Sequence, residues 1–303
     1  MIGQNHSDMM TSMGLLELWQ LTWLIAVAGG LLSFRSSFCR GFVLQGKMRT
    51  PAAVSQLPGL SLLRVEVPKS YWTWFYLVGA LHSFFMLVIT VFWQHTQAVQ
   101  YALHFAHPSV EEGNSIILTR SHTITFLTLF SVHTTRRFLE SLLVTEFGDA
   151  KMHACILFVG TYHYVATVLS VLFDPDSITI HEFTVYRTAM AGLGMMIFIT
   201  ASYHQTRCNY LLAKQKRANN MKHVIPRGDW FEAVRSPLYT TEIMLYAGFI
   251  LVTGGTTIML YLVSAWVVVN QILLAQISSQ WVEDKFRDRI NELPKWKLLP
   301  HIW

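Results

Sequence analysis

Charged residues are scarce in this sequence. They make up 14% of the 303 residues, and hydrophobic residues make up 52%, whereas a soluble domain of ordinary composition carries about 25% charged residues. This excludes an ordinary soluble domain and predicts an all-α polytopic membrane protein that forms a single domain over residues 1–303. The net charge of +5 does not indicate nucleic acid as a partner, because the basic residues lie in short segments between apolar runs.

Cysteine is also rare, and the three positions, Cys39, Cys155 and Cys208, have no motif spacing. This pattern predicts free thiols and no disulfide framework. The thirteen histidines form no HExxH motif and no His/Cys pair at zinc spacing, so we expect no metal site. The motifs GxSxG, GxxxxGK[ST] and GxGxxG after a strand are missing as well, which argues against nucleophilic hydrolysis and soluble-type nucleotide binding.

Long apolar runs, by contrast, are abundant, and seven of them suit membrane helices of about 20 residues. They are Leu15–Phe34, Tyr71–Trp93, Ser115–His133, Met152–Phe173, Thr188–Tyr203, Leu238–Gly254 and Thr256–Trp281. The segments between them alternate between basic ones and ones without Lys or Arg. By the positive-inside rule, this predicts about seven spans with a lumenal N-terminus and a cytosolic C-terminus. Six spans remain an alternative because some runs are short.

The most distinctive stretch is the segment His204–Glu242, which contains seven Lys or Arg and the sequence IPRGDWFE followed by SPLYTTE. Lys and Arg pair with phosphate through charge-assisted hydrogen bonds. Topology determination and attraction to lipid headgroups would explain the charge alone. The order of the polar residues along this segment favours a further role. It predicts a cytosolic loop that binds a phosphate-rich cofactor. A carboxylate such as Glu242 in the first turn of a helix is favoured by the dipole and can accept from a ribose hydroxyl.

Aromatic residues near the ends of the runs, among them Trp72, Tyr76 and Trp281, are interpreted as anchors at the headgroup level with no part in function. His163 lies between two tyrosines inside an apolar run, and we interpret it as a packed interior histidine.

The stretch IPRGDWFEAVRSPLYTTE resembles the C-terminal region of the steroid 5-alpha-reductase family, most closely its polyprenol/polyprenal reductase branch. Supporting pieces are EVPK at 66–69, HTTRR at 133–137 and HQTRC at 204–208. The resemblance runs from about residue 60 to the end. It implies a seven-helix endoplasmic-reticulum membrane enzyme that binds NADPH from the cytosolic side, mainly through residues 133–303. Such an enzyme reduces a carbon–carbon double bond conjugated to a carbonyl, here in a long-chain isoprenoid on the way to dolichol for protein N-glycosylation. The oligomeric state stays open, and a monomer is compatible with this picture.

By this resemblance, Glu66 and Thr134 are the expected catalytic residues, with a protonated, buried Glu66 or Thr134 stabilising the developing enolate oxygen of an enal. The residues expected on the cofactor are Arg137, Gln205, Asn209, Lys216, Arg217, His223, Tyr239 and Glu242.

The chain departs from the family pattern at three positions. Thr134 stands where the steroid enzymes have a tyrosine proton donor, Leu238 where the family tends to have Asn or His, and Val282 where it has Tyr. These losses would weaken NADPH binding, shift its contacts to neighbours such as Tyr239, or leave the chain inactive.

Several alternatives remain open at this point. A steroid 3-oxo-4-ene 5-alpha-reductase or a trans-2-enoyl-CoA reductase would share the cofactor and the chemistry. An isoprenyl-cysteine-type membrane methyltransferase would bind S-adenosylmethionine, and a non-enzymatic lipid-binding membrane protein would show no turnover with a nicotinamide cofactor.

Overall fold

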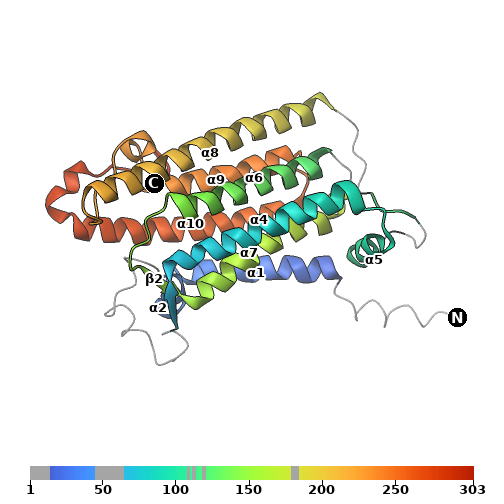
Figure 1. Cartoon of the computed structure of the whole chain (residues 1–303), viewed down its shortest axis with the longest axis horizontal. Coiled ribbons are helices and arrows are strands. Elements are labelled where there is room, and N and C mark those ends of the chain that lie inside the picture. Colours follow the sequence, from blue (N-terminus) through green and yellow to red (C-terminus); the bar gives the residue numbers. More distant parts are fainter. Residues whose placement is uncertain (1–13, 45–64, 108–109, 111–113, 118–120, 179–183) are drawn as a thin grey trace.

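The computed structural model describes residues 14–44, 65–107, 110, 114–117, 121–178 and 184–303. In this part of the chain, long helices lie side by side in an elongated bundle (Figure 1). The long helices are α1 (Leu15–Leu32), α4 (Trp72–Val88), α6 (Ser121–Leu143), α7 (Ala154–Phe173), α8 (Val185–Ala218), α9 (Pro237–Val252) and α10 (Ile258–Lys285). Each of them overlaps one of the predicted apolar runs.

Shorter elements join these helices at both ends of the bundle. They are α2 (Ser37–Val43), β1 (Glu66–Pro68), η4 (Lys69–Tyr71), the π-helix η5 (Ile89–Trp93), α5 (Gln97–Ala106), β2 (Lys151–His153), η6 (Pro175–Ser177), η7 (Asp229–Glu232) and η8 (Arg287–Glu292). The strands β1 and β2 pair antiparallel, with Val67 opposite Met152, so the connection before α4 is joined to the one before α7.

Four helices of the described part are long and apolar enough to cross a membrane: α4 with its flanking turns, α7, α8 and α10. A fifth span arises if α1 and α2, which meet at 111°, count as one broken span. The mainly helical membrane architecture is therefore confirmed, whereas seven spans and the orientation of the termini stay predictions.

Two predicted boundaries were wrong. Helix α6 does not end at His133 but continues to Leu143, because Arg136, Arg137 and Glu140 on it neutralise one another. Helix α8 continues to Ala218, so the first part of the predicted loop His204–Glu242 is helical. The basic side chains in the last turn of α8 are favourable there because they face the negative end of the helix dipole.

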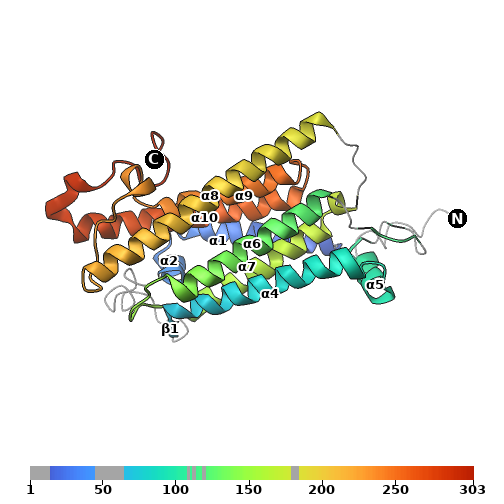
Figure 2. The same ribbon diagram turned by 45° about the horizontal axis from the view of Figure 1, so that its top comes forward.

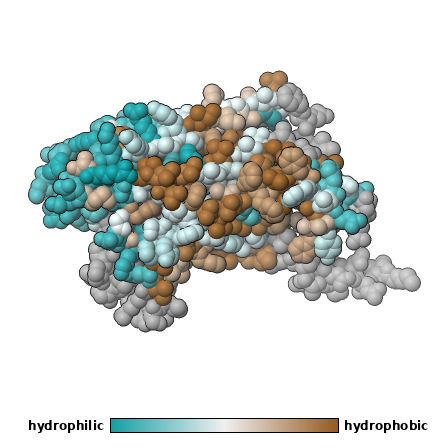
Figure 3. Space-filling view, in the orientation of Figure 1, coloured by the Kyte–Doolittle hydropathy of each residue, from teal (hydrophilic) through white to brown (hydrophobic). Residues whose placement is uncertain are grey.

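One end of the molecule is polar. The ends of α8 and α10, the strand pair and α2 gather there (Figures 1 and 2). Figure 3 shows a hydrophilic surface at this end and an apolar band over the middle of the bundle. The basic segments of the described chain therefore share one end, as the charge alternation predicts.

Helix α9 lies close against α8. A Cβ atom added at Gly194 would come within 2.7 Å of the Gly248 carbonyl oxygen, so the two backbones approach in a way that larger residues would prevent. On its other side α9 contributes Phe249, which packs against Phe126 and Phe130 of α6 in the buried core. This packing fixes the helix that carries Glu242.

Candidate functional site

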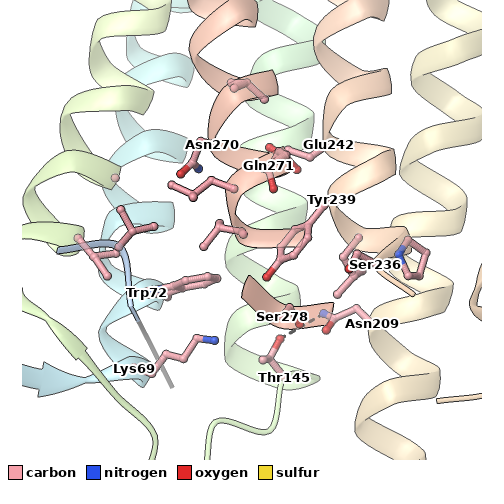
Figure 4. A pocket seen from close by; sticks show the side chains of 18 of the residues that line it. Lys69, Trp72, Thr145, Asn209, Ser236, Tyr239, Glu242, Asn270, Gln271 and Ser278 are labelled. Carbon is pink, nitrogen blue, oxygen red and sulfur yellow. Dashed lines mark hydrogen bonds between the residues drawn. The ribbon is translucent and has the colours of Figure 1, made fainter. Parts of the chain in front are cut away.

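A cavity of about 850 Å³ extends through the polar end of the bundle into its interior. This volume lies at the upper part of the range of roughly 300–1,000 Å³ for small-molecule sites. Helices α1, α2, α4, α6, α7, α8, α9 and α10 all contribute to its wall. One part of the wall is polar and basic, and another part is apolar. Figure 4 shows Glu242 in the polar part, beside Gln271 and Asn270.

The polar half of the cavity is formed by the end of α8, the segment after it, and α10. Asn209 donates to Thr145 Oγ1 (3.2 Å) from its side-chain nitrogen. Lys216 donates to the Glu146 carbonyl oxygen (2.6 Å), and His223 packs edge-on against Trp281. Further polar side chains of this wall are Lys69, Arg235, Ser236, Asn270, Gln271 and Ser278. This half thus combines cationic groups with amide and hydroxyl groups.

A buried hydrogen-bond network lies where the two halves meet. Gln205 donates to Glu242 Oε2 (2.7 Å) and accepts from Arg136 Nη2 (2.5 Å). The other carboxylate oxygen of Glu242 lies 3.7 Å from His133 Nε2. A glutamine that both donates and accepts is fixed in one orientation, so the Glu242 carboxylate is held in place from the α8 side.

The second part of this network reaches α4. Arg137 pairs with Glu140 (2.5 Å) and donates from Nη2 to the hydroxyl of Tyr76 (3.0 Å). Its guanidinium carbon also lies 5.0 Å from the centre of the Tyr76 ring. Arg136 shares the same Glu140 carboxylate. A buried guanidinium is tolerated only when it is paired, and Glu140 meets this requirement for both arginines.

The apolar half is formed mainly by α1, α2, α4 and α7. Among its lining residues are Trp23, Gly29, Phe42, Phe75 and Val159. A Cβ atom at Gly29 would meet nothing within 4 Å, so the wall is open at this position. An extended apolar molecule fits such a surface better than a charged one.

The GDWFE turn fastens the polar half to α8. Gly228 and Asp229 both adopt positive φ angles, 89° and 51°. The Asp229 carboxylate accepts from His204 Nδ1 (2.7 Å) and Arg207 Nε (2.8 Å), and Trp230 stacks on His204 with ring centres 4.4 Å apart. Burial raises the pKa of Asp229, but the hydrogen bonds from His204 and the Trp230 amide outweigh it, so the net pKa is lowered. Asp229 and Trp230 therefore build the loop and do not line the cavity, whereas Phe231 of the same turn does line it.

The structure brings most of the predicted cofactor residues together. Those that line the cavity are Arg137, Gln205, Asn209, Lys216, His223, Tyr239 and Glu242. Leu238 and Val282, two of the three positions at which the chain departs from the pattern of the family it resembles, line it as well.

Three predicted site residues lie outside the cavity. Glu66 is on β1, 3.6 Å from Lys151, and its side chain is 28% exposed, so the burial expected for it was wrong. Thr134 is fully buried and donates to carbonyl oxygens of its own helix, which turns its hydroxyl away from the cavity. Arg217 pairs with Glu146 and is half-exposed, because it lies on the outer side of the end of α8.

Sequence reasoning missed several lining residues. Trp72, Tyr76 and Trp281 were interpreted as headgroup anchors, but all three line the cavity, and Tyr76 is buried. Asn270, a polar residue within an apolar run and for that reason a candidate from the sequence, does line the cavity, and Ser278 of the same helix lines it as well. His163 lies inside the bundle, 2.6 Å from the Tyr246 hydroxyl, but it also lines the cavity, which its interpretation as a packed interior histidine does not include.

Comparison with known proteins agrees with this site. The family model described as 3-oxo-5-alpha-steroid 4-dehydrogenase matches residues 150–303, which contain most of the polar half. The human polyprenal reductase is 30% identical over 242 residues, covering 73% of this chain and 74% of that protein. The chain belongs to the 3-oxo-5-alpha-steroid 4-dehydrogenase family. It is therefore an oxidoreductase that acts on carbon–carbon double bonds.

Other relatives carry the same description. The polyprenal reductase of Ailuropoda melanoleuca is 29% identical, with 73% of this chain and 74% of that protein covered. Polyprenal reductase 1 of Arabidopsis thaliana is 24% identical, with 94% and 96% covered. The similarity to the plant protein therefore extends over nearly the whole length of both chains.

Within the described residues, no group of three or more His, Cys, Asp or Glu side chains is arranged to hold a metal ion. The expectation of a metal-free site stays a prediction for the chain as a whole.

Proposed function

We propose that this protein uses NADPH to reduce the α carbon–carbon double bond of a long-chain polyprenal, a step towards dolichol for protein N-glycosylation. The observation that carries the proposal is one continuous cavity in which a cationic, amide-rich half meets an apolar half at Glu242. The description of the relatives as polyprenal reductases supports the same substrate class.

The side chains of the polar half fit NADPH. Lys69, Lys216 and Arg235 supply positive charge for phosphate groups. Gln205, Asn209 and Glu242 supply the amide and carboxylate groups that a ribose or a nicotinamide amide requires. Bound NADPH would supply a hydride to the electron-poor β carbon of the enal. The network around Glu242 holds the polar wall in position, and the aromatic wall excludes water.

The same proposal includes the placement in the membrane. The chain would form one domain in the endoplasmic-reticulum membrane, with seven spans, a lumenal N-terminus and a cytosolic C-terminus. The polar half, within residues 133–303, would then open to the cytosol, where NADPH is available. An epitope tag placed after Trp303 should be accessible to antibody in sealed microsomes without detergent, and a protected tag would contradict this orientation.

Purified protein in detergent should be supplied with NADPH and a long-chain polyprenal, and the saturated aldehyde should be sought by mass spectrometry. Parallel reactions with a steroid 3-oxo-4-ene and a trans-2-enoyl-CoA test the two reductase alternatives. Binding of S-adenosylmethionine in place of NADPH would favour a methyltransferase. If no acceptor supports NADPH oxidation and NADPH does not bind, the proposal is wrong.

A variant at Lys216 tests whether NADPH binds in the polar half of the cavity. Lys216→Ala should weaken NADPH binding about ten-fold, because one cation near the phosphates is lost. Lys214→Ala is the matched control, since Lys214 is an exposed basic residue of the same helix and does not line the cavity.

A further inference from the structure

The two proton donors predicted from sequence do not reach the cavity. Glu66 is on the exposed strand β1, and the Thr134 hydroxyl is bonded within α6 and to Ser83. Reduction of an enal nevertheless needs a group that stabilises charge on the carbonyl oxygen. Neither residue can provide this group from its position in the structure.

We propose that Tyr76 of α4 is the catalytic acid that binds the carbonyl oxygen of the substrate. Tyr76 is only 5% exposed and lines the cavity where its two halves meet. The proposal rests on the proposed function, because it needs an acceptor that carries a carbonyl group.

The hydrogen bonding of Tyr76 fixes the direction in which it can donate. A tyrosine hydroxyl has one hydrogen to donate and lone pairs to accept with. Arg137 Nη2 donates to this oxygen at 3.0 Å, and an arginine cannot accept in return. In the part of the chain that the structure describes, Arg137 is the sole hydrogen-bond partner of the Tyr76 hydroxyl. Its own hydrogen therefore remains available to a molecule in the cavity.

The charge beside Tyr76 favours proton transfer. The Arg137 guanidinium faces both the oxygen and the ring, so it stabilises a phenolate. Tyr164 and Tyr239 line the same cavity, but no guanidinium donates to their hydroxyls among the hydrogen bonds of the described residues. Tyr76 thus differs from Tyr164 and Tyr239 in that its hydroxyl accepts a hydrogen bond from a cation.

The proposed step begins at the β carbon of the enal. As the β carbon is reduced by the nicotinamide hydride of the proposed function, the electron pair of the double bond moves towards the carbonyl. Its oxygen takes the proton of Tyr76, which leaves a phenolate against Arg137 and an enol of the substrate. The α carbon then gains a proton from water, and the enol returns its O–H proton to Tyr76. The sum is the addition of one hydride and one proton.

Removing the Tyr76 hydroxyl tests the inference. In Tyr76→Phe the kcat for polyprenal should fall about 100-fold or more, whereas the Kd for NADPH should change less than two-fold. Tyr261→Phe is the matched control, because Tyr261 lies outside the cavity wall and donates to the Gly255 carbonyl oxygen, and its kcat should stay within two-fold of the wild type.

A second readout does not depend on turnover. Geranial, a short isoprenoid enal with a ¹³C-labelled carbonyl, should show a lowered carbonyl stretch when bound to the wild-type protein. This shift should vanish in Tyr76→Phe and persist in Tyr261→Phe. An unshifted band in the wild type, or a kcat within three-fold of wild type in Tyr76→Phe, would overturn the assignment. Absence of turnover in the wild type would contradict the proposed function, and the infrared band would still decide whether Tyr76 binds a carbonyl.

Discussion

The two halves of the cavity are built in different ways. In the polar half, Asn209, Lys216 and Gln205 each donate a side-chain hydrogen bond to a neighbouring residue. The apolar half is a wall of aromatic side chains and glycines, with open space at Gly29. A wall fixed by hydrogen bonds suits a ligand of constant shape, since preorganised groups bind with little loss of entropy. A wall held by packing alone suits a ligand that differs in length.

The strongest test of this difference is Glu242→Ala. The change leaves the Gln205 amide nitrogen buried without its acceptor, which costs about 1–3 kcal/mol. NADPH binding, followed by tryptophan fluorescence, should weaken by roughly 10- to 100-fold. Asp284→Ala, at an exposed acid outside the cavity wall, serves as the control. An unchanged Kd would mean that the network does not organise the polar half.

A second test weakens the GDWFE turn, which attaches the polar half of the cavity to α8. Asp229→Asn removes the charge that His204 and Arg207 bond to, which costs about 2 kcal/mol and lowers Tm by roughly 4–8 °C. Because the folded pKa of Asp229 is lowered, its contribution is complete above the unfolded value of about 3.9. It is lost as the pH falls further through the folded pKa. The Tm difference between wild type and variant should therefore shrink below about pH 4, as thermal unfolding in buffers of different pH can show.

The apolar half is tested by filling it. Gly29→Leu places a side chain in open space on the cavity wall, so kcat/KM for a long-chain polyprenal should fall about ten-fold with no change in NADPH affinity. Gly192→Leu is the matched control, because Gly192 also has nothing within 4 Å of an added Cβ but lies on α8 away from the cavity. Equal losses in both variants would show that the change acts through the membrane surface and not through the cavity.

The variant with the smallest expected effect adds a polar group to the polar half of the cavity. Leu238→Asn adds an amide to the cavity wall, at a position where the sequence resemblance implies Asn or His. One additional hydrogen bond is worth about 0.5–1.5 kcal/mol, so NADPH should bind roughly three-fold tighter. Weaker binding would show that the surrounding wall leaves no acceptor or donor within reach of residue 238.

The sequence predicts the helices well, because each apolar run is long and continuous. It misplaces the ends of α6 and α8, where charged residues continue the helix. The charges of Arg136, Arg137 and Glu140 look like the end of a span, yet they neutralise one another across successive turns. Local patterns do not show which charged residues will be partners.

The site is predictable only in part, for a similar reason. The polar lining residues of α8 and α9 lie close together in the sequence, so their shared motif identifies them. Tyr76 comes from α4 and reaches the cavity by packing against Arg137 of α6. Its hydrophobic neighbours give it the pattern of a headgroup anchor, and only the tertiary structure separates the two roles.

Helix α8 has 34 residues, which gives it a length of about 51 Å, whereas the hydrocarbon layer is about 30 Å thick. Asn209 and Lys216 lie in its last third, beyond the apolar part. Under the proposed function, the phosphates of NADPH would therefore lie at the depth of the headgroups. The aldehyde end of the isoprenoid would enter the apolar half of the cavity, while the rest of its tail stays among the acyl chains. An enzyme built this way would recognise the aldehyde end of its lipid substrate, and its activity would not depend on the number of isoprene units.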